Sequence, residues 1–239
     1  MSESLDGTIE VRELTAEEIL SRVLHRDGLM LVIDKPAGLP VHRGPKGGAN
    51  LESSFDALRF GLPRPPVLAH RLDRETTGCL VLGRHRKATA SLGLLFKHGR
   101  ISKTYWAVVE GGPAQDEGII NMPLGRLNAE RGWWQKPDPE GQSAVTNWKV
   151  MGRGHSLTWL ALEPVTGRTH QLRVHSAAMG WPIVGDNIYS APRFGGPRLH
   201  LHSREVVIPI SRNKDPVRVT APAPEHMRQR LKACGWNGE

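Results

Sequence analysis

The pattern of hydrophobic and polar residues predicts more strands than helices. Short runs rich in apolar, β-branched and aromatic residues, bounded by glycine and proline, are typical of strands. These runs are 29–33, 79–83, 102–111, 156–164, 198–210 and 216–222. The strand-like runs do not alternate strictly with helices, so the pattern favours an α+β fold: a mainly antiparallel, mixed β-sheet core with flanking helices and loops.

Helical spacing of apolar residues predicts four short helices. Thr15 and Glu18 have the spacing of a capping box, and a stripe of Ile19, Leu20, Val23 and Leu24 follows them. The other three predicted helices cover 53–60, 87–97 and 225–233. The segment 111–142, rich in glycine, proline and charge, predicts hairpins and loops at one edge of the sheet.

The length of the chain is consistent with one large mixed domain. Its 239 residues exceed the usual single-domain size but remain within the range of one core. We expect an N-terminal extension with a short helix over 1–24, a main domain over 25–223, and a C-terminal helix and tail over 224–239. No oligomerisation signal stands out, so we expect a monomer.

The charge of the chain predicts a polyanionic partner. Lysines and arginines number 32 against 24 acids, which gives a net charge of +8, and nucleic acid is the natural candidate. No apolar run approaches the roughly 18 residues of a membrane-spanning helix, and no signal-peptide pattern is present. The two cysteines, Cys79 and Cys234, are far apart. We therefore expect a cytoplasmic protein without a disulfide framework.

Asp73 is the strongest candidate for a catalytic group. It lies between Arg71 and Arg74 in the stretch AHRLDRETTGCLVLGR, and positive charge within a few ångströms favours the ionised form of a carboxylate. An ionised aspartate is a competent nucleophile. Glu75, two residues on, is the candidate second acid, and the paired-acid pattern is weak here. The alternative is a solvated turn that leads into a buried strand.

A second basic constellation covers residues 163–175. Its Thr-Gly-Arg turn predicts that Arg168 approaches a phosphate and that Arg173 reaches a buried acid in bidentate geometry. The alternative is a turn followed by a helix with a solvated basic face. Two histidine pairs suggest metal ligands, but no pattern completes either set, and we expect no metal and no other cofactor. The two pairs are His170 with His175 and His200 with His202.

The aromatic residues divide into candidates for stacking and candidates for the core. Trp133, Trp134 and Tyr105 lie in contexts where they can stack on bases, as in proteins that bind single strands. Aromatic residues within strands are more often buried, and that interpretation fits the remaining set best. This set is Trp106, Trp148 and Trp159.

Five ordered motifs resemble those of the RluA-type pseudouridine synthases. They are LVIDKPAGLPVH, AHRLDRETTGCLVLGR, ISKTYWAVVEG, PVTGRTHQLRVHSAAMGWPIVGDNIY and RLHLHS, and the resemblance covers about residues 24–222. It implies an isomerase that converts uridine in rRNA or tRNA to pseudouridine without a cofactor. The implied fold is that of the synthase catalytic domain, with RNA as the partner.

The resemblance implies a role for each candidate residue. Asp73 of the HRLD motif is the implied nucleophile, and Arg71 is similar to the arginine that enters the RNA stack during base flipping. Tyr105 is the implied uracil-packing residue and general base. Arg173 is the implied salt-bridge partner of Asp73, and Leu172 lines the uracil pocket. We add Arg168, His70 and Arg74, which lie in the same motifs, as substrate-binding candidates.

Two departures from the family pattern are mild, and two other functions remain open. Thr77 stands where serine is usual, and Ser190 stands where glycine often follows the tyrosine. A non-catalytic RNA-binding module would keep the charge and the aromatic residues but would leave RNA unmodified. A glycosidase or base-excising enzyme would share the nucleophile but would release free base.

Overall fold

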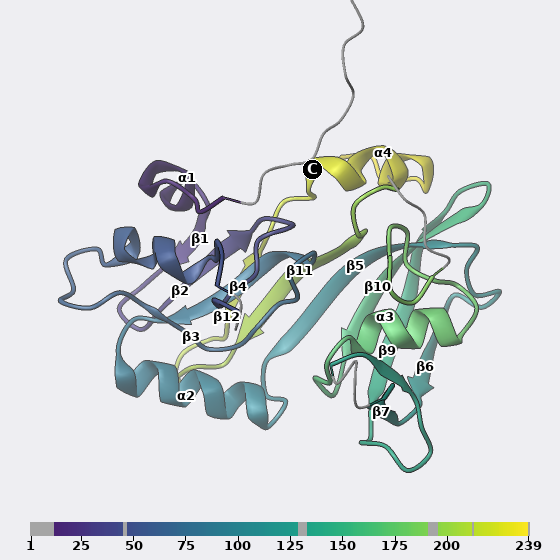
Figure 1. Cartoon of the computed structure of the whole chain (residues 1–239), viewed down its shortest axis with the longest axis horizontal. Coiled ribbons are helices and arrows are strands. Elements are labelled where there is room, and N and C mark those ends of the chain that lie inside the picture. Colours follow the sequence, from purple (N-terminus) through teal and green to yellow (C-terminus); the bar gives the residue numbers. More distant parts are fainter. Residues whose placement is uncertain (1–11, 45–46, 129–132, 191–195, 212, 239) are drawn as a thin grey trace, which may run out of the picture.

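The computed structural model describes residues 12–44, 47–128, 133–190, 196–211 and 213–238, and one large sheet forms its centre. The ten strands of this sheet are β1 (Val23–Arg26), β2 (Met30–Lys35), β3 (Val67–Leu68), β4 (Thr77–Gly83), β5 (Ser102–Glu110), β6 (Glu117–Asn121), β9 (Val145–Arg153), β10 (Leu157–Pro164), β11 (Leu201–Ile208) and β12 (Val217–Thr220). The order is β1-β2-β4-β11-β5-β10-β9-β6, with β12 beside β11 and β3 beside β4. Strands β11 and β4 run parallel, whereas the other neighbours run antiparallel. This arrangement confirms the predicted α+β fold with a mixed, mainly antiparallel sheet (Figure 1).

Five helical segments accompany the sheet in the described part of the chain. They are α1 (Ala16–Leu20), the 3₁₀ helix η1 (Glu52–Leu58), α2 (Arg86–Lys97), α3 (Gln171–Ala178) and α4 (Glu225–Ala233). Helix α2 packs on β4, and α4 packs on β5 and β10. Both partners of the predicted capping box are present at the start of α1. The helix predicted to continue beyond it was wrong, because Val23 and Leu24 belong to β1, which pairs with β2.

A small hairpin lies outside the large sheet. Strands β7 (Leu124–Arg126) and β8 (Gln135–Pro137) pair with each other, and β8 contacts α3. The segment 111–142 thus holds the edge strand β6 and this hairpin, as its composition predicted, although residues 129–132 lie outside the described residues. Figure 1 shows α3 and the hairpin close to β9 and β10.

The central strands are buried on both faces of the sheet. Every residue of β4 is buried. Leu80 and Leu82 join one hydrophobic cluster, whereas Cys79 and Val81 join another. Because successive side chains of a strand point to opposite faces, a continuous apolar run serves a strand that is covered on both sides. This burial gives a rigid base to the loop that leads into β4.

Candidate functional site

The loop between β3 and β4 carries Asp73, and a buried lysine holds it in place. The amide of Thr76 donates to the carbonyl of Asp73 over 3.1 Å, which closes a tight turn. Lys35, fully buried at the end of β2, donates from Nζ to the carbonyl oxygens of Pro36 and Arg74, both at 2.8 Å, and of Thr76 at 3.0 Å. Burial lowers the pKa of Lys35 to about 7, and the charges of Glu75 and Asp73 oppose that shift. The backbone on both sides of Asp73 is therefore tied to β2.

Gly78 allows β4 to start close to its neighbour. Its φ is +100°, in the left-handed region, and a Cβ there would run into the carbonyl oxygen of Ser203 and the ring of His202 on β11. Only glycine meets both conditions without strain. The close approach of β4 and β11 therefore depends on this residue, five positions after Asp73.

Most of the predicted site residues line one cavity of about 490 Å³. They are His70, Arg71, Asp73, Tyr105, Arg168, Leu172 and Arg173. Arg74 is outside this lining, since its Nε donates to the carbonyl of Gly38 over 2.9 Å and lies 3.3 Å from a carboxylate oxygen of Glu75. The turn directs its side chain to the loop after β2, and the substrate-binding role of Arg74 stays a prediction.

The titratable group that contacts Asp73 is a histidine. His170 Nε2 lies 3.7 Å from Asp73 Oδ2, and the aspartate side chain is 35% exposed. Neither Arg71 nor Arg74 forms an ion pair with Asp73 in the part of the chain that the structure describes. The expectation of an aspartate held between two arginines is therefore corrected: Arg74 binds Gly38 and Glu75, and Arg71 lines the same cavity as Asp73 without an ion pair to it.

Arg173 also has a different partner from the one expected. Its Nε and Nη2 donate to the two carboxylate oxygens of Asp186 over 2.7 and 2.8 Å. This fork matches the predicted bidentate contact with a buried acid. The acid, however, is Asp186 and not Asp73, so the predicted Arg173–Asp73 salt bridge was wrong. The charge of Asp73 still acts on Arg173 and raises its pKa, alongside Asp186.

His170 connects these groups, although its place in the sequence suggested only a metal ligand. It precedes α3 with a φ of +54°, a left-handed conformation that is unusual for a residue with a side chain. Its Nδ1 lies 2.7 Å from the hydroxyl of Tyr189, and its Nε2 lies 3.4 Å from Arg173 Nη1. Burial lowers the pKa of His170, and the charge of Asp73 opposes that shift. The signals in the sequence were the THQLR and GDNIY motifs, whose side chains meet here.

Tyr105 reaches the cavity from β5. It is paired in register with Ser203 on β11 and with Leu162 on β10, so its backbone is fixed from both sides. Burial raises the pKa of its phenol well above the usual value. The residue is therefore a neutral phenol at neutral pH, which favours packing over the predicted role as general base.

Ring stacking and apolar side chains form the remaining wall. His70 stacks on Phe96 with ring centroids 4.2 Å apart, and its Nε2 accepts the amide hydrogen of Val81 over 3.0 Å. Burial lowers the pKa of His70 to about 3, so the ring is neutral and donates from Nδ1. Leu172 and Leu201 are buried beside the cavity. Together these groups offer flat and apolar surfaces for a planar ring.

Positive charge surrounds the opening. Arg71 and Arg168 are exposed, and Lys103 lies deeper, where burial lowers its pKa. Arg168 Nε donates to the carbonyl of Ser143 over 3.0 Å, and its amide donates to Gln171 Oε1 over 3.0 Å. These contacts fix the Thr-Gly-Arg turn as a cationic rim that suits a phosphate.

The predicted histidine pairs are used for internal hydrogen bonds. His175 contacts Thr146 and the carbonyl of Met122, and His202 contacts Thr77 and the carbonyl of Ala221. Among the described residues, no cluster of three His, Cys, Asp or Glu side chains can hold a metal ion. The described residues also include no helix that is long and apolar enough to cross a membrane.

The buried tryptophans follow the prediction. Trp148 and Trp159 are buried, and Trp106 packs partly buried against Trp159. Trp133, in contrast, is 58% exposed and lines the cavity. It remains a candidate for stacking.

Comparison with known proteins gives consistent matches. The family model for RNA pseudouridylate synthase matches residues 29–178. A protein of Zymomonas mobilis, described as an uncharacterized RNA pseudouridine synthase, is 41% identical over 212 residues, which are 87% of this chain and 95% of the relative. Ribosomal large subunit pseudouridine synthase C of Vibrio cholerae is 33% identical and covers 87% of this chain and 68% of the relative. The solved structure of human RNA pseudouridylate synthase domain containing 4 has a TM-score of 0.77 and 27% identity, and covers 92% of this chain and 95% of that chain.

Proposed function

Because this chain belongs to the RNA pseudouridine synthase family, an isomerase family that acts on uridine in RNA, we propose that Asp73 is its nucleophile. The observation that carries the proposal is the position of Asp73. Its partly exposed carboxylate enters a cavity of about 490 Å³ whose walls are apolar and aromatic and whose rim is cationic. The walls suit a uracil ring, the rim suits the phosphates, and the carboxylate lies between them.

The reaction needs one carboxylate and no second acid. The C1′–N1 bond of uridine breaks, the detached uracil rotates, and a bond forms between C1′ and C5. The hydrogen on C5 is then released as a proton, and N1 takes up a proton from solvent. Uracil leaves as a stabilised anion and stays in the pocket, so its departure requires no external acid. Asp73 acts either by attack on C1′ or by assisting the loss of a 2′ proton, and both routes need its ionised form.

The uridine must leave the RNA stack before Asp73 can reach it. Extrusion of a base costs a few kcal/mol and is easiest in single-stranded loops. Arg71 is exposed at the opening of the cavity, where its side chain can fill the gap left by the base. We therefore propose base flipping assisted by Arg71, with His70 and Leu172 against the extruded ring.

The remaining residues receive roles that follow their contacts. Tyr105 packs beneath the uracil as a neutral phenol, consistent with its raised pKa. Arg173 positions the start of α3 through Asp186 and acts on Asp73 by charge at longer range. Residues 25–223 form the proposed catalytic unit of a monomer, between an extension over 1–24, of which residues 1–11 lie outside the described residues, and the tail over 224–239.

The proposed substrate is rRNA or tRNA, and rRNA is the first to test. The Vibrio cholerae relative is named for the large ribosomal subunit. The net charge of +8 is consistent with either RNA.

The direct experiment is tritium release from unmodified rRNA and tRNA transcripts labelled at C5 of uridine. Wild type should release tritium without free uracil, and Asp73→Asn should reduce the rate by at least about a thousandfold, because the amide is not a nucleophile. Glu75→Gln is the matched control, since it removes a neighbouring acid that lies outside the cavity. Appreciable turnover by Asp73→Asn would remove Asp73 from its role, and RNA binding without release by wild type would favour a binding module.

A further inference from the structure

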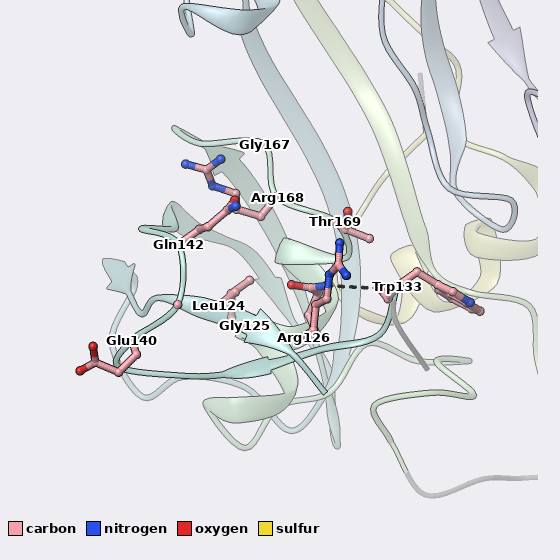
Figure 2. A pocket seen from close by; sticks show the side chains of 11 residues that line it. Leu124, Gly125, Arg126, Trp133, Glu140, Gln142, Gly167, Arg168 and Thr169 are labelled. Atoms are coloured by element: carbon pink, nitrogen blue, oxygen red, sulfur yellow. Dashed lines mark hydrogen bonds between the residues drawn. The ribbon is translucent and has the colours of Figure 1, made fainter. Parts of the chain in front are cut away.

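A second hollow adjoins the candidate active site, and the proposed chemistry does not use it. It has a volume of about 560 Å³, which is within the range of about 300 to 1,000 Å³ that is typical of ligand sites. The β7–β8 hairpin and the turn before α3 form it (Figure 2). Four residues line both hollows: Trp133, Gly167, Arg168 and Thr169. The two hollows therefore lie side by side and share part of their lining.

Two arginines give the second hollow a cationic character. Arg126 from β7 and Arg168 both line it, and neither has an acidic partner in the part of the chain that the structure describes. Glu140 is the acid in the lining, and Figure 2 shows that it points away from both arginines. Guanidinium groups without an acidic partner suit the oxygens of a phosphate.

Trp133 marks the boundary between the two hollows. The residue is 58% exposed. Its ring forms T-shaped pairs with His170 and Trp134, with centroids 5.2 and 5.8 Å apart. Neither neighbour stacks parallel to the indole, and a large part of Trp133 remains accessible to solvent. An exposed aromatic face beside a cationic groove is the arrangement with which proteins bind the bases of single-stranded RNA.

Gln135 and Gln142 add polar groups to the lining. Gln135 Nε2 donates to the carbonyl oxygens of Trp133 and Trp134, both at 3.4 Å, which fixes the amide and leaves Oε1 as an acceptor. The backbone of Gln142 is bound to Leu124 in both directions. The second hollow therefore combines an aromatic face, two cations and amide groups, which are the groups that a nucleotide requires.

We propose that the second hollow binds the nucleotide next to the target uridine, with its base stacked on Trp133 and its phosphate in contact with Arg126 and Arg168. This inference rests on the proposed function, because the uridine must occupy the neighbouring cavity. The bound nucleotide lies outside the helical stack, so the substrate is an RNA segment with two successive unpaired nucleotides. Trp133 beside His170 keeps the two bases apart.

The test uses an unmodified RNA hairpin whose target uridine has first been mapped in the rRNA and tRNA transcripts. Stacking on an aromatic ring is worth about 1 to 3 kcal/mol per base, so Trp133→Leu should raise KM about fivefold or more. Trp133→Phe, which keeps an aromatic face, should have a KM close to that of wild type. Arg126→Gln should make the salt dependence of binding shallower, whereas Lys232→Gln, which removes a charge on α4, should leave it unchanged.

An RNA with an abasic nucleotide beside the target uridine separates stacking from a structural effect. This RNA should raise the KM of wild type by a factor similar to that of Trp133→Leu, and should raise the KM of Trp133→Leu no further. The subsite would be overturned if the abasic RNA raised the KM of wild type and of Trp133→Leu by the same factor, whichever neighbour of the uridine is abasic. A KM of Trp133→Leu equal to that of wild type would also overturn it. Neither result would affect the proposal that the protein is an active synthase. If wild type forms no pseudouridine in any transcript, the proposed function fails and the subsite with it.

Discussion

At the scale of single residues, the candidate site depends on groups that hold the Asp73 turn as much as on groups that face its carboxylate. Lys35 binds three backbone carbonyls on and around that turn, and His170 Nε2 lies 3.7 Å from the Asp73 carboxylate. The motifs predicted most of the residues that line the cavity, because these residues lie in a few short stretches of the sequence. The motifs did not predict the partners, since Arg173 and Asp186 are thirteen positions apart and meet only through the fold.

Lys35 gives the stability of the protein a defined pH dependence. Its folded pKa is about 7, whereas the ordinary lysine value is 10.5. Between these values the unfolded chain binds more protons than the folded protein, so this group makes stability rise with pH. The unfavourable burial of its charge is fully present below about pH 7 and is relieved above it.

We therefore expect the stability difference between wild type and Lys35→Met to change with pH. Urea unfolding should show the variant losing stability relative to wild type by several kcal/mol as the pH rises from about 6.5 to 9.5, since the variant lacks the proton release. The variant also loses the three hydrogen bonds of Lys35 to backbone carbonyls, and this loss of stability should be the same at both pH values. Parallel curves for the two proteins across this range would contradict the assigned shift.

At the scale of elements, the pattern within a segment predicted its secondary structure better than it predicted contacts between segments. Helix α4 spans the predicted residues 225–233, because its apolar stripe and the preceding proline are local features. The predicted helix over 53–60 formed as the 3₁₀ helix η1 over Glu52–Leu58. The parallel contact of β4 with β11 joins residues about 125 positions apart, and no local pattern encodes it.

The buried pair of Arg173 and Asp186 ties α3 to the turn that carries Tyr189. Their side chains are 5% and 1% exposed, and the pair raises the pKa of the arginine and lowers that of the aspartate. Removal of one partner of a buried pair leaves an uncompensated charge, which costs about 3 to 5 kcal/mol. We expect Asp186→Asn to lower the free energy of unfolding by that amount, measured in urea.

The matched control is the exposed pair of Arg218 and Glu205, whose arginine is 63% exposed. Glu205→Gln should cost at most about 1 kcal/mol, because solvent screens exposed pairs. The double variant Arg173→Met with Asp186→Leu should recover much of the stability lost in Asp186→Asn, since it removes both charges. If Asp186→Asn is no more destabilising than Glu205→Gln, the pair does not hold α3 in place.

At the scale of the whole molecule, the net charge of +8 and the two adjoining hollows describe one surface for an RNA strand. The composition predicted the polyanion, but it could not show that Arg71, Arg126 and Arg168 line adjoining hollows, because they come from three separate loops and strands. Each phosphate contact on a single strand makes the logarithm of the binding constant fall by about 0.7 per unit of log salt. Three contacts therefore predict a slope of about −2.

Fluorescence anisotropy with a labelled single-stranded RNA, titrated between about 50 and 200 mM salt, measures this slope. Wild type should give about −2 or steeper, and a strand of the same sequence with an uncharged backbone should give a slope close to zero. The uncharged strand should bind more weakly but should still stack on Trp133. Its affinity should therefore decrease further in Trp133→Leu. A flat response of the natural RNA would mean that the arginines do not contact its phosphates, and RNA recognition would then depend on the bases alone.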